Sequence, residues 1–289
     1  MTQLIIPTDE RSLVKGAAQL WLAKHGVALP ALDEAGDGIV SFNVQTITLD
    51  SGFTGSFTLA FGGQTTASLS NTSDGDAVET ALEALSNIGE GNVQVTGASG
   101  GPHTVTFLNW LRTAHLPLLQ SDDADVTVSR DWMLAGFREN GLSVNEVEEE
   151  EQHSVDEHLT AIDRSRTVEG LEISCNVVNA TLDQLTLVSP SGSYSLHAPT
   201  ATKVGHEQFA FGDGNNDPFY QALIFAKNGM GYFYARHVFK VKGLRTGERA
   251  FEKGGLWHVP MQFHAYGDLG KAPGTRLYRD YNMTETVTA

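Results

Sequence analysis

Two short stretches carry the residue types of a metal site. Residues 213–217 read Asp-Gly-Asn-Asn-Asp, like the start of a calcium loop, but Pro218 and Ile224 occupy the positions that require glycine and a bidentate glutamate. His153 and His158 lie in an acidic run, and their five-residue spacing does not place two imidazoles on one helical face. We therefore predict a turn at 213–217, a solvated surface around the histidines, and no metal site.

Nucleophilic and phosphate-binding chemistry is equally poorly supported. Residues 89–92 (Gly-Glu-Gly-Asn) are too short and too acidic to hold a phosphate. Cys175 lies in an alternating apolar run with no CxxC or Cys/His grouping around it, which predicts a small core residue. No GxSxG or HExxH motif occurs, and nothing places the carboxylates of 146–157 in a desolvated cleft. We predict no catalytic residue, no cofactor and no enzymatic activity.

The charge of the chain is unevenly placed. The formal net charge is −16, and residues 41–129 contain nine acids and one base. Residues 131–170 contain eleven acids and three bases, whereas 171–289 are close to neutral with ten acids and eleven bases. Such a surface repels nucleic acid. The alternative, that the acidity only maintains solubility, stays open.

Membrane insertion and export are not expected. No stretch approaches the roughly 20 consecutive apolar residues of a membrane span. The first 15 residues contain Asp9, Glu10 and Arg11, where a secretory signal needs an uninterrupted apolar run. We therefore expect a protein made in the cytoplasm and not exported by this route.

The residue pattern of 41–130 predicts a separate β-rich module. Short alternating runs separated by glycine-containing turns predict its strands. One helix interrupts them, with a capping box at Ser73 and Asp76, a one-sided stripe of Val78 and Leu82, and a stop at Gly89. The predicted strands are 46–49, 56–61, 66–69, 92–96, 104–107 and 126–129.

The flanking segments 1–40 and 131–289 are predicted to form one discontinuous β core with a short helix at 181–187. Its acidic run, at about 143–160, predicts a long loop because so many charges are not buried. The tail, about 267–289, has little apolar periodicity and predicts an extended arm. The predicted core strands are 16–24, 132–137, 167–178, 219–226, 232–241 and 257–263.

The module resembles small β-rich modules that recur in virion proteins of phages infecting actinobacteria. The resemblance is carried by several blocks of sequence over some 80 residues. These blocks are Gly-Ser-Phe-Thr-Leu-Ala-Phe-Gly-Gly at 55–63, Ala-Leu-Glu-Ala-Leu at 81–85, Gly-Asn-Val-Gln-Val-Thr-Gly at 91–97 and Gly-Pro-His-Thr-Val-Thr-Phe at 101–107.

The joined flanking segments resemble the major tail tube proteins of phages with long, non-contractile tails. The likeness lies in the order of the early strand at 18–23, the strand at 132–137 leading into the acidic loop, the helix at 181–187 and the closing strand around 259–265. The resemblance implies a mainly β, tail-tube-type β-sandwich or barrel core that assembles into stacked hexameric rings. Such a tube is the conduit for DNA ejection in a virion assembled in the host cytoplasm.

The same resemblance implies the partners. These are other copies of the chain, the tape measure protein and the tail terminator, with DNA passing through without specific binding. The acidic residues are candidates for ring-to-ring or lumen contacts, and the module is expected to project outward. The alternatives are another decoration or baseplate protein of a virion, or a carbohydrate-binding adhesin whose module contacts host-surface glycans. The candidate contact residues are Glu146, Glu148, Glu149, Glu150, Glu151, Asp156 and Glu157.

Overall fold

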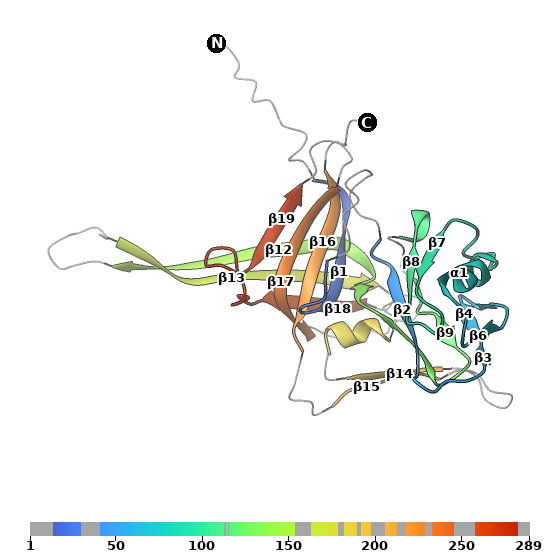
Figure 1. The fold of residues 1–289 in the computed structure, drawn as a ribbon. Helices are drawn as coiled ribbons and strands as arrows, with labels where there is room; N and C mark the ends of the chain where they lie inside the picture. Colours follow the sequence, from blue (N-terminus) through green and yellow to red (C-terminus); the bar gives the residue numbers. More distant parts are fainter. Residues whose placement is uncertain are drawn as a thin grey trace, which may run out of the picture. The chain divides into compact units, whose positions relative to one another are not determined.

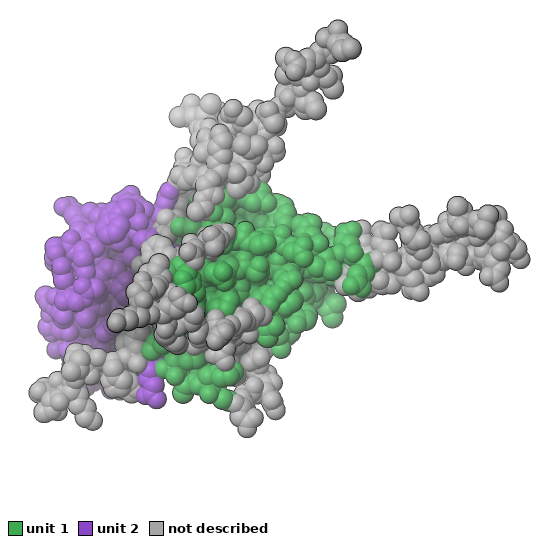
Figure 2. Space-filling view, turned by 180° about the vertical axis from the view of Figure 1, so that it is seen from behind, with its two compact units in different colours: residues 1–26, 135–195, 209–284 green, residues 27–134, 196–208, 285–289 purple. Residues whose placement is uncertain are grey.

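A computed structural model describes most of the chain as β-strands, with one α-helix in the described ranges. This confirms the predicted mainly β fold. The chain forms two compact units, unit 1 with residues 1–26, 135–195 and 209–284, and unit 2 with residues 27–134, 196–208 and 285–289 (Figure 2). The described residues are 14–29, 41–112, 114, 116–153, 163–178, 182–189, 192–197, 206–212, 218–228, 233–245 and 258–282.

The region that contains the predicted module is built from short strands around one helix. Its main sheet has the order β10-β2-β8-β7, with a three-stranded sheet β5-β4-β9 and the pair β3-β6 beside it. The strands are β2 (Val44–Leu49), β3 (Ser56–Phe57), β4 (Leu59–Phe61), β5 (Gln64–Thr65), β6 (Leu69–Ser70), β7 (Val93–Thr96), β8 (His103–Phe107), β9 (Gln120–Ser121) and β10 (Val126–Arg130), and the 3-10 turn η2 spans Asn109–Leu111.

Helix α1 (Gly75–Glu83) is capped one residue later than predicted. The Asp74 carboxylate accepts a hydrogen bond from the Ala77 N–H at 3.0 Å. The Ser73 hydroxyl instead accepts from the Ser70 N–H in the preceding turn. The predicted stripe is correct, because Val78 and Leu82 are fully buried.

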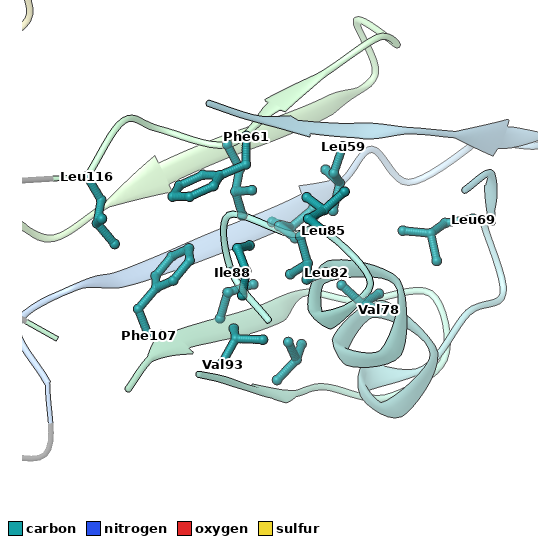
Figure 3. Packing of buried hydrophobic residues seen from close by; sticks show 14 of the residues in the cluster. Leu59, Phe61, Leu69, Val78, Leu82, Leu85, Ile88, Val93, Phe107 and Leu116 are labelled. Carbon is teal, nitrogen blue, oxygen red and sulfur yellow. The ribbon is translucent and has the colours of Figure 1, made fainter. Parts of the chain in front are cut away.

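The module core is a closed apolar cluster between α1 and the sheets (Figure 3). Phe61 and Phe107 stack with ring centroids 5.4 Å apart. Burying apolar side chains in this way is the main driving force for the fold. The cluster consists of Ile47, Phe57, Leu59, Phe61, Leu69, Val78, Leu82, Leu85, Ile88, Val93, Val95, Val105, Phe107, Leu111, Leu116, Leu119 and Val126.

The largest sheet has eight strands and contains the long strands of the chain. Its order is β11-β1-β16-β17-β18-β13-β12, with β19 paired to β17. A separate pair, β14-β15, completes the described strands. The bounds are β1 (Val14–Lys24), β11 (Trp132–Leu134), β12 (Phe137–His153), β13 (Asp163–Val178), β14 (Ser193–His197), β15 (His206–Ala210), β16 (Tyr220–Asn228), β17 (Phe233–Arg245), β18 (His258–Ala265) and β19 (Tyr278–Asn282).

Strands β1 and β16 form the buried centre of unit 1. Leu20, Trp21 and Leu22 are consecutive and all buried, so β1 is covered on both faces. They pair in antiparallel register with residues 222–224 of β16, which are also buried. Cys175 is a buried residue of β13, as predicted.

The sheet of unit 1 curls so that its two ends meet. The Ala135 N–H donates to the Leu20 carbonyl of β1, and β12 begins only two residues later at the opposite end of the strand order. Two residues span less than about 10 Å, which forces the ends together. Gly136 links Ala135 to the start of β12. Its backbone φ is +111°, and a Cβ there would lie 2.8 Å from Val177 Cγ1.

The structure corrects part of three expectations for unit 1. Residues 143–153 of the predicted acidic loop belong to β12, which runs to His153, and β13 starts at Asp163. Within the predicted arm, residues 278–282 form strand β19, and residues 283–289 lie outside the described residues. The helix predicted at 181–187 is a 3-10 turn, η3 (Gln184–Leu187), whose Leu187 carbonyl lies against Gly243 of β17.

Within the described residues, no helix has the length and hydrophobicity to cross a membrane. The turn predicted at residues 213–217 lies outside the described residues.

Candidate assembly surface

The acidic run forms a β-ribbon whose inner part contains apolar residues among its charges. Leu142, Val144 and Val147 are half-buried, whereas Glu146 and Glu148 are exposed. Strand β12 pairs with β13 in antiparallel register over nearly its full length. The charge pattern predicted a loop, but the run pairs with β13 instead. Apolar pairs such as Val144 with Ile173 support its inner part, and Glu150 lies opposite Arg166 further out. The ribbon extends beyond the other strands of its sheet (Figure 1).

The ribbon pairs mainly with itself. Strand β13 pairs with β18 from Glu172 to Val178, so in the described residues Asp163–Leu171 pairs with β12 only. The strand order places β12 at one end of the sheet. A strand edge without a partner exposes backbone N–H and C=O groups that can pair with another chain.

The predicted contact residues have different positions on this ribbon. Glu148 and Glu149 are exposed on β12. Glu150 and Glu151 also belong to β12, in register with Arg166 and Ser165. Asp156 and Glu157 lie outside the described residues, as does His158.

Glu146 is held at the base of the ribbon by Arg236 of β17. The Arg236 Nη1 donates to Glu146 Oε1 at 2.7 Å. Half of the Glu146 side chain is exposed, and 19% of the Arg236 side chain is. This predicted contact residue is therefore already engaged within its own chain.

Arg236 also fixes β19 through two parallel hydrogen bonds. Its Nε and Nη2 donate to the two carboxylate oxygens of Asp280, both at 2.8 Å, across a register pair of β17 and β19. The guanidinium carbon lies 4.2 Å from the centroid of the Tyr278 ring. The hydrogen bonds that Arg236 donates to Asp280 raise the pKa of Arg236, which stays charged. We call Arg236, Glu146, Asp280 and Tyr278 the Arg236 clamp.

Sequence reasoning missed the clamp. Arg236 stood out only as one of the alternating polar positions in the strand predicted at 232–241, and Asp280 lay in the predicted arm. One signal in the sequence could have found it: Arg236 lies within a strongly predicted strand, and an arginine that is half-buried in a sheet needs a carboxylate partner.

A buried polar pair lies on the inner face of the same strand. His237 Nε2 is 2.9 Å from Gln221 Oε1 on β16, and His237 is 7% exposed. Burial, with the positive charges of Lys271 and Arg279 and with His25 nearby, lowers the pKa of His237 to about 4. The imidazole is therefore neutral near pH 7 and serves the packing of the core.

The ribbon of β12 and β13 presents negatively charged side chains and unpaired strand edges that another surface could contact. In the described part of the chain, no group of three or more His, Cys, Asp or Glu side chains is placed to hold a metal ion. The arrangement can bind another surface by strand pairing and by ion pairing.

Comparison with known proteins gives no relatives: no protein-family model matches the chain, and no curated protein matches its sequence.

Proposed function

We propose that this chain is a structural virion protein that assembles into stacked hexameric rings, forming the tail tube through which phage DNA leaves the particle. The observation that carries the proposal is the acidic ribbon. Its outer part, residues 148–153 of β12 and 163–169 of β13, pairs only with itself among the described residues. An isolated two-stranded ribbon is marginally stable in water, so a further strand or surface is needed to hold it.

Assembly supplies such a surface. A ring pairs exposed sheet edges between copies and so removes them. The negative charge that remains on the tube repels DNA during its passage. The tape measure protein and the tail terminator are the further partners that the tail-tube resemblance implies.

The test is the oligomeric form of the purified protein in negative-stain images. The wild-type chain should form stacked rings or hollow tubes. A matched variant removes the outer ribbon by joining Val147 to Gly170 through Asn-Gly, because these two residues are directly opposed and a two-residue turn can link them.

We expect the shortened variant to fold, by circular dichroism and thermal melting, and to lose ring stacking. A wild-type chain that stays strictly monomeric at high concentration would refute the proposal. Tubes of normal length from the shortened variant would show that the ribbon is not the assembly element.

A second candidate function is glycan binding by the module, as in an adhesin or a virion decoration protein. Trp110 in η2 is 63% exposed, and the adjacent Asn109 has a positive φ of 50°. An exposed indole offers an apolar face to a ligand. Glycan-array binding that disappears in Trp110→Ala, while tubes do not form in the wild type, would favour this candidate.

Removal of the module separates the two functions. Replacing residues 44–128 by a short Gly/Ser bridge should leave a tube-forming core if the module is a decoration. Aggregation of that variant would place the module boundary elsewhere, and glycan binding that survives the deletion would exclude the module as the binding part.

A further inference from the structure

Two lysines share one aromatic ring on the surface of unit 1. The Lys240 Nζ lies 4.0 Å from the centroid of the Phe219 ring, and the Lys242 Nζ lies 4.8 Å from it. The Tyr266 ring packs edge-on against Phe219, with centroids 5.7 Å apart. We call these four residues the Phe219 patch.

The backbone fixes the members of this patch. Lys240 and Lys242 are two residues apart on β17 and so point to the same face. The Tyr266 N–H donates to the Lys240 carbonyl at 2.8 Å, and the Phe219 carbonyl accepts from the His25 N–H at 2.9 Å. Phe219 is half-buried and Tyr266 is 45% exposed, so the patch is accessible in the protomer.

The positive charge of the patch is not balanced within the described residues. No carboxylate of the described ranges forms an ion pair with Lys240 or Lys242. Two ammonium groups on one ring repel each other, and a carboxylate placed between them would relieve that repulsion. In a chain with a net charge of −16, this is a localised acceptor for acidic groups.

We propose that the Phe219 patch of one copy binds the glutamate-rich part of β12, centred on Glu148 and Glu149, of a second copy. This inference rests on the proposed self-assembly and names the surface that receives the ribbon. Glu148 and Glu149 are exposed and opposite in charge to the patch. As neighbours on a strand they point to opposite faces, so one of these carboxylates at a time faces the patch. A nucleic acid is the weaker fit, because the net charge of the chain repels a polyanion.

Charge reversal tests the pairing. We expect Lys240→Glu with Lys242→Glu to raise the critical concentration for assembly at least about tenfold, since two attractive contacts become repulsive. The matched control, Lys240→Arg with Lys242→Arg, keeps both charges and should assemble like the wild type. Adding Glu148→Lys and Glu149→Lys to the reversed chain should restore assembly.

Several outcomes would overturn the inference. Wild-type assembly by the reversed variant would do so, as would failure of the fourfold variant to recover while its melting temperature is unchanged. Loss of binding to a labelled DNA duplex in the reversed variant, with assembly intact, would assign the patch to nucleic acid.

Carbodiimide cross-linking separates this inference from the proposed function. In a mixture of isotopically light and heavy wild-type chains, we expect cross-links from Lys240 or Lys242 to Glu148 or Glu149 between light and heavy copies. Their presence without visible tubes would support the contact and count against the tube. Visible tubes with no such cross-links would support the tube and overturn the contact.

Discussion

The two units of the chain differ in how far their strands reach. In the module region no described strand exceeds six residues, and the strands enclose a shared apolar cluster with one helix. In unit 1, β12 and β13 have 17 and 16 residues and continue past the strand that supports them. The module therefore completes its core within itself, whereas unit 1 carries strand length that its own core does not cover.

The largest effect expected is on the module core. Phe107→Ala should destabilise the module by about 3–5 kcal/mol, because Phe107 is fully buried and stacked on Phe61. Calorimetry of the full chain should show a lower melting temperature for the module and an unchanged melting temperature for unit 1. Trp110→Ala, at an exposed aromatic, should change stability by less than about 0.5 kcal/mol. A common shift of both transitions would show that the units melt as one.

A substitution at Gly136 tests the link between the two ends of the unit 1 sheet. Gly136→Ala should cost about 2–4 kcal/mol, because a Cβ meets Val177 at a backbone φ of +111°. Gly141→Ala is the matched control, since Gly141 has a φ of +81° with nothing within 4 Å, and its cost should be near 1 kcal/mol. Chemical denaturation measures both, and equal costs would contradict the steric argument.

Buried His237 should make unit 1 sensitive to acid. Its pKa falls from the ordinary 6.5 to about 4 on folding, so below pH 6.5 the unfolded chain binds more protons. Stability should be full above pH 6.5 and should fall by about 2 kcal/mol between pH 7 and pH 5. Denaturant titrations at both pH values measure the fall, and His237→Gln should reduce it. If the free energy of unfolding of that variant falls by the same amount between pH 7 and pH 5, the acid sensitivity belongs to other groups.

The smallest effect is expected at the clamp. Arg236→Met should loosen β19 and the base of the ribbon by about 1–2 kcal/mol, because the charged hydrogen bonds are partly exposed. Hydrogen exchange should rise in residues 278–282 and stay unchanged in the module. Arg279→Met, at an exposed neighbour, should leave the exchange of β19 near wild type. Equal exchange in both variants would mean that the clamp does not hold β19.

Local patterns predicted the elements that local residues decide. The stripe of Val78 and Leu82 and the alternation of the strong strands were sufficient for the mainly β fold and its helix. The Asp74 cap was missed by one residue because the Ser73 hydroxyl is used by the turn before it. Such competition between neighbouring hydrogen bonds is not visible in a spacing rule.

Elements decided by distant partners were not predicted. Strand β19 depends on Asp280 facing Arg236, 44 residues earlier in the chain, and the charge-rich β12 depends on its register with β13. For the candidate surface, the sequence identified the acidic residues, whereas the Arg236 clamp and the Phe219 patch arise from pairings between segments far apart in the chain.

The pairing of β1 with β16 also sets an order for biosynthesis. Strand β1 ends at Lys24, and its partner strand begins at Tyr220, so nearly two hundred residues must be made before the two can pair. The module, by contrast, has its last strand at Arg130 and is ready to fold while its ribosome is still translating unit 1. The buried face of β1 therefore waits exposed through most of translation, and a contact of such long range forms slowly. The sheet of unit 1 is in this way the last part of each chain to mature, so the polymerisation proposed above would follow nearly complete synthesis.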